Sequence, residues 1–97
     1  MRTSGVLLLL VLIWPGVAAA AQLRLTWMDN SSNEAGFQIE RRIGTTGPFT
    51  PITTVGMNIA AYVDATVSAG TTYCYQVRAF KVGGTSAPSN VACRQGQ

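Results

Sequence analysis

The sequence predicts an all-β domain, an antiparallel sandwich of about six strands. Three observations predict this fold. Apolar side chains alternate with polar ones along short runs, turn-forming residues separate the runs at intervals of roughly 8–12 residues, and no apolar stripe of helical spacing follows Gln22. Two sheets that cover each other's apolar faces would bury the large side chains of these runs.

The N-terminal segment predicts a signal peptide, residues 1–21, ahead of a single domain, residues 22–97. Arg2 precedes a stretch that is apolar from Val6 to Trp14, and small residues at Ala19–Ala21 suit a cleavage site. A retained membrane anchor is the rival interpretation, but the apolar run is short for a span of about 20 residues. We therefore expect a secreted or periplasmic domain with no membrane span after cleavage.

The expected mature domain carries little net charge and few catalytic groups. The chain has seven Lys and Arg and four Asp and Glu; without Arg2, six cations and four anions leave a net charge of +2. Since the cations form no basic cluster, nucleic acid is not an expected partner. There is no histidine, and so small a sandwich has no deep cleft for facing carboxylates. We predict a non-enzymatic domain without cofactor or metal.

The first three expected strands are residues 22–29, 37–43 and 49–55, each an apolar and polar alternation bounded by turn-forming residues. Glu40 falls on the polar side of its strand and is expected in solvent. Pro51 has no backbone N–H to donate, so the third strand is expected at the edge of a sheet.

The last three expected strands are a short one within residues 60–67 that ends near Asp64, followed by residues 72–80 and 87–94. Asp64 is expected in a turn. Residues 72–80 alternate most clearly, and the Gly83-Gly84 pair that follows them is a hairpin signal. The side chains that alternation turns inward form the expected core: Trp27, Phe37, Ile39, Tyr62, Val67, Tyr73, Tyr75 and Val77.

Three stretches of the chain resemble a fibronectin type III domain of the kind found in exported bacterial proteins. They are LRLTWMDNSSNEAGFQIERR, YVDATVSAGTTYCYQVRAF and GGTSAPSN, which cover nearly all of the expected mature chain. The resemblance implies an immunoglobulin-like sandwich with Trp27 at the centre of the core. It also implies a corner between Val67 and Tyr73, where the tyrosine hydroxyl is expected to hydrogen-bond to backbone upstream.

The first strand of that family is short or missing here. The strand that contains Trp27 begins within about two residues of the expected cleavage site, so almost no chain precedes it. Either the natural start is longer, or the signal segment is not cut there, or the domain lacks one edge strand. In the last case residues 22–28 form an open edge, which can pair with a strand of another chain, and a strand-edge dimer is one expected assembly.

The two cysteines are expected to form a disulfide between the last two strands. With Gly83-Gly84 at the tip of a two-residue turn, the hairpin register places Cys74 directly opposite Cys93. Directly opposite Cα atoms lie about 4.5–5.5 Å apart, which is within disulfide range. The pair lacks the CxxC spacing or histidine of a redox or metal site. The bridge is expected on the outer face of the sheet.

The sequence identifies no ligand, only surfaces that could bind one. Loops on a rigid sandwich are common recognition surfaces, as is an outer sheet face. The candidate binding residues are Asp29, Glu34, Met57, Arg78, Phe80 and Lys81. We expect a secreted interaction module that binds another protein or a cell-surface glycan through its loops, outer sheet face or open edge. The alternative is a structural or spacer module split from a larger secreted enzyme or adhesin, without its own ligand.

Overall fold

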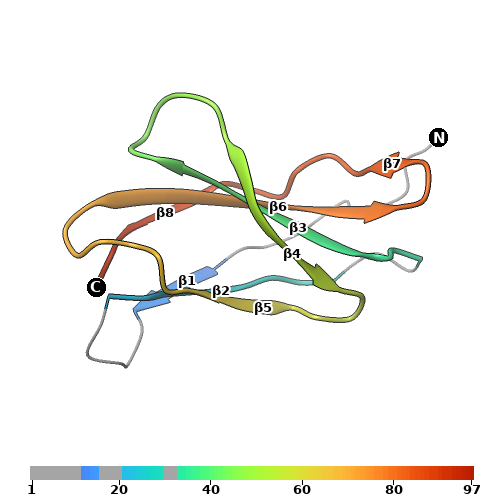
Figure 1. The fold of residues 1–97 in the computed structure, drawn as a ribbon, viewed down its shortest axis with the longest axis horizontal. Coiled ribbons are helices and arrows are strands. Elements are labelled where there is room, and N and C mark those ends of the chain that lie inside the picture. Colours follow the sequence, from blue (N-terminus) through green and yellow to red (C-terminus); the bar gives the residue numbers. More distant parts are fainter. Residues whose placement is uncertain (1–11, 16–20, 30–32) are drawn as a thin grey trace.

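A computed structural model describes residues 12–15, 21–29 and 33–97, and within these ranges the chain is built of strands without a helix (Figure 1). The all-β prediction is confirmed. The strands are β1 (Leu12–Pro15), β2 (Leu23–Thr26), β3 (Gly36–Ile43), β4 (Thr50–Gly56), β5 (Ala61–Asp64), β6 (Thr72–Lys81), β7 (Gly84–Thr85) and β8 (Ala92–Gln95). None of the described residues belongs to a helix long and apolar enough to cross a membrane.

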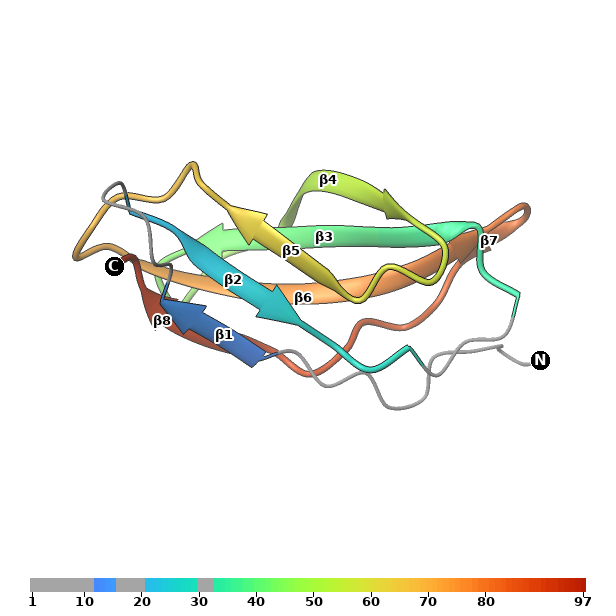
Figure 2. The ribbon, with the colours of Figure 1, turned by 90° about the horizontal axis from the view of Figure 1, so that it is seen from below.

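The strands form two antiparallel sheets that face each other as a sandwich. One sheet has the order β1-β2-β5, and the other has the order β4-β3-β6, with β7 and β8 both paired to β6. Figure 2 shows the smaller sheet lying across the larger one. Consecutive strands β3 and β4 form a hairpin, whereas β2 pairs with β5 across the sequence, so the domain is held together by long-range pairings.

The core lies between the sheets and is filled by the side chains that alternation turns inward. Trp27 and Phe37 meet edge to face, with ring centroids 5.7 Å apart. Tyr62, expected in the core, is only partly buried and packs against it from the margin. The buried apolar cluster comprises Leu23, Leu25, Trp27, Phe37, Ile39, Val67, Tyr73, Tyr75, Val77 and Ala79.

The corner between Val67 and Tyr73 has the geometry that the resemblance implied. The backbone N–H of Ser68 donates a hydrogen bond to the hydroxyl oxygen of Tyr73 over 2.7 Å. Both Val67 and Tyr73 are buried, so this bond fastens the loop between β5 and β6 to the core.

The last expected strand, residues 87–94, is interrupted in the structure. Lys81 pairs with Gly84, so the hairpin tip is Val82-Gly83 and not Gly83-Gly84. An unbroken ladder from Phe80 opposite Thr85 would place Asn90 opposite Tyr75, but Ala92 lies there. Two extra residues are therefore accommodated between β7 and β8.

Two serine hydroxyls maintain the hydrogen bonding where that ladder is interrupted. The Ala79 N–H donates to Ser86 Oγ over 3.0 Å, and the Val77 N–H donates to Ser89 Oγ over 2.9 Å. The backbone N–H groups of the same serines donate back to the carbonyls of Ala79 and Val77. Because β6 is central to its sheet, these bonds satisfy donors that burial would otherwise leave unpaired.

The first strand of the fold covers one edge of β2 in the full chain. β1 pairs with every residue of β2, from Leu12 opposite Thr26 to Pro15 opposite Leu23, so β2 is the middle strand of its sheet. The prediction of a short first strand is therefore right. The open edge was expected only for a chain cut after Ala21, and that case stays a prediction. β1 lies inside the segment that the sequence predicts to be a signal peptide.

The strand that contains Pro51 does lie at an edge, as predicted. β4 is the outer strand of the larger sheet, next to β3. Ile39 pairs with Thr53 while Glu40 pairs with Pro51, which leaves Ile52 as the extra residue of a β-bulge. A proline and a bulge both discourage another chain from pairing with an edge.

Candidate functional site

The disulfide between Cys74 and Cys93 is confirmed, with the two cysteines directly opposite each other on β6 and β8. Their register results from a turn tip that lies one residue earlier than expected and from two extra residues between β7 and β8, and the two effects cancel. Cys74 is fully buried although it lies on the face opposite Tyr73 and Tyr75, and its sulfur is 3.3 Å from the carbonyl oxygen of Gly44. The bridge thus joins β6 and β8 with Cys74 buried beside the loop that follows β3 and Cys93 exposed.

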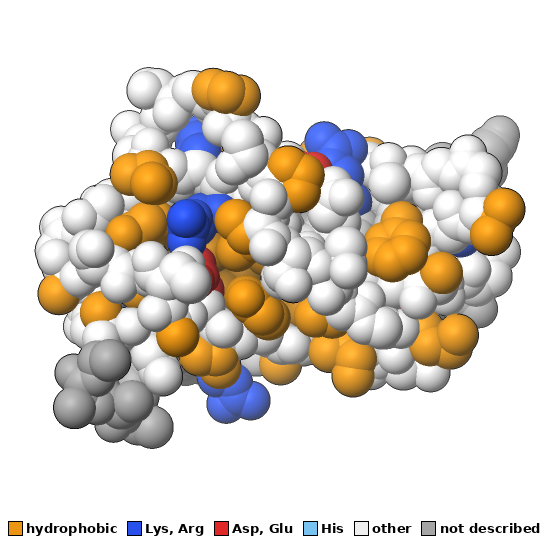
Figure 3. All heavy atoms as spheres, in the orientation of Figure 1, with side chains coloured by type: hydrophobic (Ala, Val, Ile, Leu, Met, Phe, Trp, Pro, Cys, Tyr) orange, Lys and Arg blue, Asp and Glu red, His pale blue; other side chains and the backbone are white. Residues whose placement is uncertain are grey.

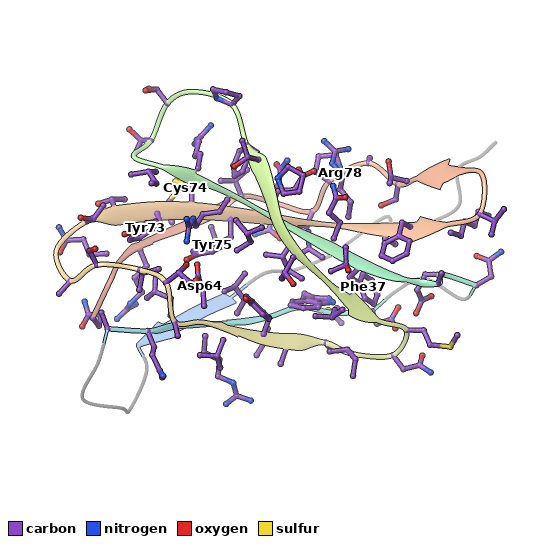
Figure 4. All side chains as sticks on the ribbon, in the orientation of Figure 1. Phe37, Asp64, Tyr73, Cys74, Tyr75 and Arg78 are labelled. Atoms are coloured by element: carbon purple, nitrogen blue, oxygen red, sulfur yellow. A yellow bond between two sulfur atoms is a disulfide. The ribbon has the colours of Figure 1, made fainter. Side chains whose placement is uncertain are left out.

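Asp64 was expected in a turn, and this prediction is wrong. It is a fully buried carboxylate at the end of β5. It accepts hydrogen bonds from the Tyr75 hydroxyl over 2.7 Å and from Arg41 over 2.9 Å. The Thr66 hydroxyl and N–H donate to its other oxygen. Figure 4 shows Tyr75 on β6 and Asp64 on β5 directed toward each other between the sheets. We call Asp64, Arg41, Tyr75 and Thr66 the inner cluster.

The inner cluster holds Asp64 ionised. Burial by itself raises the pKa of Asp64, but hydrogen bonds from Thr66 and Tyr75 and the contact with Arg41 outweigh it and lower the pKa below its usual value. Burial and the adjacent carboxylate raise the pKa of Tyr75, which therefore stays protonated. Every member has a partner inside the protein, so the cluster is a structural tie between the two sheets.

Glu40 is also buried, which corrects the expectation that it lies in solvent. Only 7% of it is exposed, because side chains from the neighbouring strand cover it on the outer face of the larger sheet. Gln76 donates to one carboxylate oxygen over 2.6 Å and Arg78 to the same oxygen over 3.2 Å, while Gln38 donates to the other. We call Glu40, Gln38, Gln76 and Arg78 the outer cluster.

The outer cluster engages one of the candidate binding residues, Arg78. Burial raises the pKa of Glu40, but hydrogen bonds from Gln76, Arg78 and Gln38 have the larger combined effect, and the pKa lies below its usual value. Arg78 also donates to the backbone carbonyl of Ser86 over 3.2 Å. Its guanidinium is thus held between Glu40 and the segment after β7, and is partly exposed.

Phe80 is the second candidate residue on this face, and it covers a glycine. Gly36 lies directly opposite it on β3, and a Cβ added to Gly36 would come within 2.9 Å of the Phe80 ring and would also clash with the Val55 carbonyl oxygen. The ring therefore fills the space that the missing side chain leaves in the sheet. Phe80 is partly buried and does not stand free as an aromatic platform.

The remaining candidate residues, Asp29, Glu34, Met57 and Lys81, lie at one end of the sandwich. Glu34 is buried, and its carboxylate accepts a hydrogen bond from the Asn58 N–H over 3.4 Å, which ties two loops together. Asp29 is partly buried, whereas Lys81 is exposed and Met57 is 58% exposed. The Glu34 carboxylate thus ties loops together at this end, and other side chains supply the exposed surface.

Several large apolar side chains are exposed at this end. Val82, at the tip of the β6–β7 hairpin, is 99% exposed. Figure 3 shows several apolar side chains toward the right, around that hairpin and the β4–β5 turn. The exposed apolar side chains here are Met28, Met57, Ile59 and Val82, and we call this set the hairpin end.

Only one member of the hairpin end, Met57, was predicted from the sequence. The missed residues, Met28, Ile59 and Val82, stand beside or within turn stretches, where an apolar side chain has no strand partner to cover it. An apolar residue beside or within a turn was the sequence signal that could have identified these exposed side chains. Within the described residues, no group of three or more His, Cys, Asp and Glu side chains could hold a metal ion.

No family model matches this sequence, and no curated protein matches it. Several solved structures do match this chain. The fibronectin type III domain of human fibronectin type III domain containing protein 3 has a TM-score of 0.73 and 25% identity, over 98% of this chain and 89% of that one. An Fn3-like protein from Clostridium thermocellum has a TM-score of 0.64 and 27% identity, over 76% of this chain and 82% of that one.

A third similar structure is much longer than this chain. The twitchin kinase region from C. elegans has a TM-score of 0.63 and 21% identity, and the match covers 74% of this chain but only 13% of that one. In that protein the matching part is a small portion of a larger assembly. Together with the sheet order and the tyrosine corner, these matches show that this chain has the fold of a fibronectin type III domain.

Proposed function

We propose that this chain is a non-enzymatic, exported protein-interaction module that binds its partner through the hairpin end. The observation that carries the proposal is the exposure of Met28, Met57, Ile59 and Val82 at one end of a rigid sandwich. Exposed apolar side chains that gather on one surface mark a site for another protein. The buried Glu34 and its bond to Asn58 support this surface by ordering the loops that present it.

A protein partner suits these surfaces better than a glycan does. Sugar binding favours exposed aromatic rings, but Phe80 covers Gly36, and the ring of Phe49 lies beneath the Arg42 guanidinium at 4.6 Å. Methionine adapts its shape to a partner because its side chain is unbranched and flexible. Met28 and Met57 would supply such adaptable contacts.

Export to the periplasm or outside a bacterial cell is part of the proposal. The leader-like composition of residues 1–21 supports it. The Cys74–Cys93 disulfide also supports it, because disulfides persist in oxidising compartments and are rare in the cytosol.

A structural or spacer module is the second candidate function. The likeness to a small portion of the twitchin kinase region favours it, since there the fold is one part of a long chain. In that role the hairpin end would contact an adjoining domain of the same assembly. The disulfide and the two polar clusters would then only make the domain rigid.

Affinity capture with paired variants tests the interaction proposal. The exported domain, its Met57→Glu/Val82→Glu variant and an Ile43→Glu/Val91→Glu control would be immobilised and exposed to cross-linked envelope extract of the source cell. The control places the same charges on exposed apolar side chains away from the hairpin end. We expect the wild type and the control to retain the same partner, and the hairpin-end variant to lose it.

Two results would count against the proposal. Equal capture by all three proteins would exclude the hairpin end as the binding surface. Failure of the wild type to retain any specific partner would favour the spacer role. Intact-mass analysis of the exported protein would test the export claim separately, because it reports both the N-terminus and the loss of two hydrogens on disulfide formation.

A further inference from the structure

The edge of β2 that β1 covers is a strand-pairing surface. The Trp27 N–H donates to the Ala60 carbonyl in the direction of β5. Backbone groups of successive residues in a strand point to alternate sides, so those of Leu23 and Leu25 also face β5. The N–H and C=O groups of Arg24 and Thr26 therefore face β1.

A second hydrogen bond supports this assignment of sides. The Gln22 N–H donates to the Gln97 carbonyl over 3.0 Å, which places the C-terminal residue on the β1 side, as the alternation requires. β1 also contacts β8, so it lies along the side where the two sheets meet (Figure 2). Loss of β1 would uncover four backbone groups, two each on Arg24 and Thr26.

The uncovered edge would keep its extended shape. Leu23 and Leu25 are fully buried, and β2 pairs with β5 along its whole length, from Leu23 opposite Asp64 to Thr26 opposite Ala61. The residues Leu23–Thr26 include neither a proline nor a bulge, in contrast to β4. Such an edge is a template for another strand.

From this geometry we infer that export processing after Ala21 removes β1 and that two processed copies then pair through β2, antiparallel and edge to edge. The inference rests on the proposed export, because processing is what uncovers the edge. The edge is self-complementary: Arg24 of each copy faces Thr26 of the other, so both outward-facing residues form hydrogen-bonded pairs and Leu25 lies on the twofold axis. This register also keeps the two Arg24 side chains from facing each other directly.

Sedimentation equilibrium on the processed protein tests the pairing. The full chain would be produced in an exporting host, its N-terminus determined by intact mass, and its association followed over a range of concentrations. Thr26→Pro removes an N–H that faces the uncovered edge. The matched control is Val63→Pro, because Val63 lies opposite Arg24 and its N–H faces away from β2, at the other edge of the same sheet.

We expect the wild type and Val63→Pro to form dimers and Thr26→Pro to dissociate at least about tenfold more readily, since proline cannot donate to the ladder. A double Arg24→Cys/Thr26→Cys variant gives a readout that does not depend on tolerance of proline. In the inferred register it should form two disulfides between copies under oxidising conditions, whereas Arg24→Cys alone should not cross-link.

The outcomes separate the pairing from the processing. A product that starts at Gln22 and stays monomeric, without cross-linking of the double variant, would overturn the pairing and leave the export proposal intact. A product that still contains Leu12–Pro15 would overturn the processing and with it the uncovered edge. Equal dimerisation of Thr26→Pro and the wild type would show that the copies associate through another surface.

Discussion

The inner and outer clusters each contain one ion pair, and they differ in what the pair connects. Arg41 and Asp64 belong to different sheets, with 2.9 Å between Nη1 and Oδ2, and the side chain of Asp64 is only 1% exposed. Arg78 and Glu40 lie on adjacent strands of one sheet, with 3.2 Å between Nε and Oε1, and the Arg78 side chain is 30% exposed. The first pair joins the two layers, and the second reinforces a ladder that backbone hydrogen bonds already hold.

The comparison shows that the cost of losing a charge depends on what remains behind. Removal of Asp64 would leave the buried Tyr75 hydroxyl without its acceptor, and the largely buried Arg41 guanidinium with the Thr66 hydroxyl oxygen but no opposite charge. Removal of Glu40 would leave the buried Gln76 amide without this acceptor, but the Arg78 guanidinium is partly exposed and keeps its bond to the Ser86 carbonyl. The inner cluster should therefore dominate stability, although both clusters have similar chemistry.

The largest expected effect is that of Asp64→Ala. Breaking a buried, hydrogen-bonded pair costs about 3–5 kcal/mol when the partner charge stays out of water, and the Arg41 side chain is only 18% exposed. We expect a loss of that order in the free energy of unfolding, measured by urea denaturation with the disulfide intact. A loss as small as that of an exposed pair would show that water reaches Arg41 in the variant, and that the inner cluster is not a tie between the sheets.

A smaller effect is expected from acid. Both carboxylates have pKa values lowered on folding, so their stabilisation is fully present above the unfolded pKa, near about 4, and is lost as the pH falls through the lower folded pKa. Unfolding free energies measured from pH 7 to pH 2 should fall for the wild type. The fall should be shallower for Asp64→Asn than for Glu40→Gln, since the inner carboxylate accepts four hydrogen bonds and the outer one three. Equal slopes in both variants would contradict the ranking of the clusters.

The smallest effect is expected for Glu40→Gln at neutral pH. Glutamine retains an acceptor for Gln76 and Arg78, so the variant loses mainly the charge, which contributes about 1 kcal/mol at a partly exposed pair. Added salt should reduce the difference between wild type and variant, because a pair near the surface is screened. If salt left the difference in unfolding free energy unchanged, the Glu40 charge would be shielded from solvent as the Asp64 charge is.

Much of the fold could be predicted because alternation acts over short distances. The period of two along residues 72–80 placed Tyr73, Tyr75 and Val77 in the core, where the structure has them. Turn chemistry placed the loops, and Pro51 identified an edge. Each of these inferences depends on a residue and its immediate neighbours, so one sequence is sufficient for it.

The two polar clusters could not be predicted because they depend on partners distant in the chain. Alternation put Glu40 on the polar face of its strand, but it could not show that Gln76 and Arg78 would cover it from β6. Asp64 looked like a turn residue because the turn signal is local, whereas Tyr75 and Arg41 approach it from the other sheet. The register of Cys74 and Cys93 was predicted with the wrong turn tip, and two extra residues before β8 restored it.

By itself the sequence determined an all-β sandwich, its inward-facing side chains and a single disulfide, because pattern, turn chemistry and a count of two cysteines are local properties. Only the tertiary structure decided that Asp64 and Glu40 are buried, that Phe80 covers Gly36 and that β1 closes the edge of β2. The physical reason is that burial and strand pairing require contacts between two segments that are distant in the sequence. Those contacts form only when the sheets pack together.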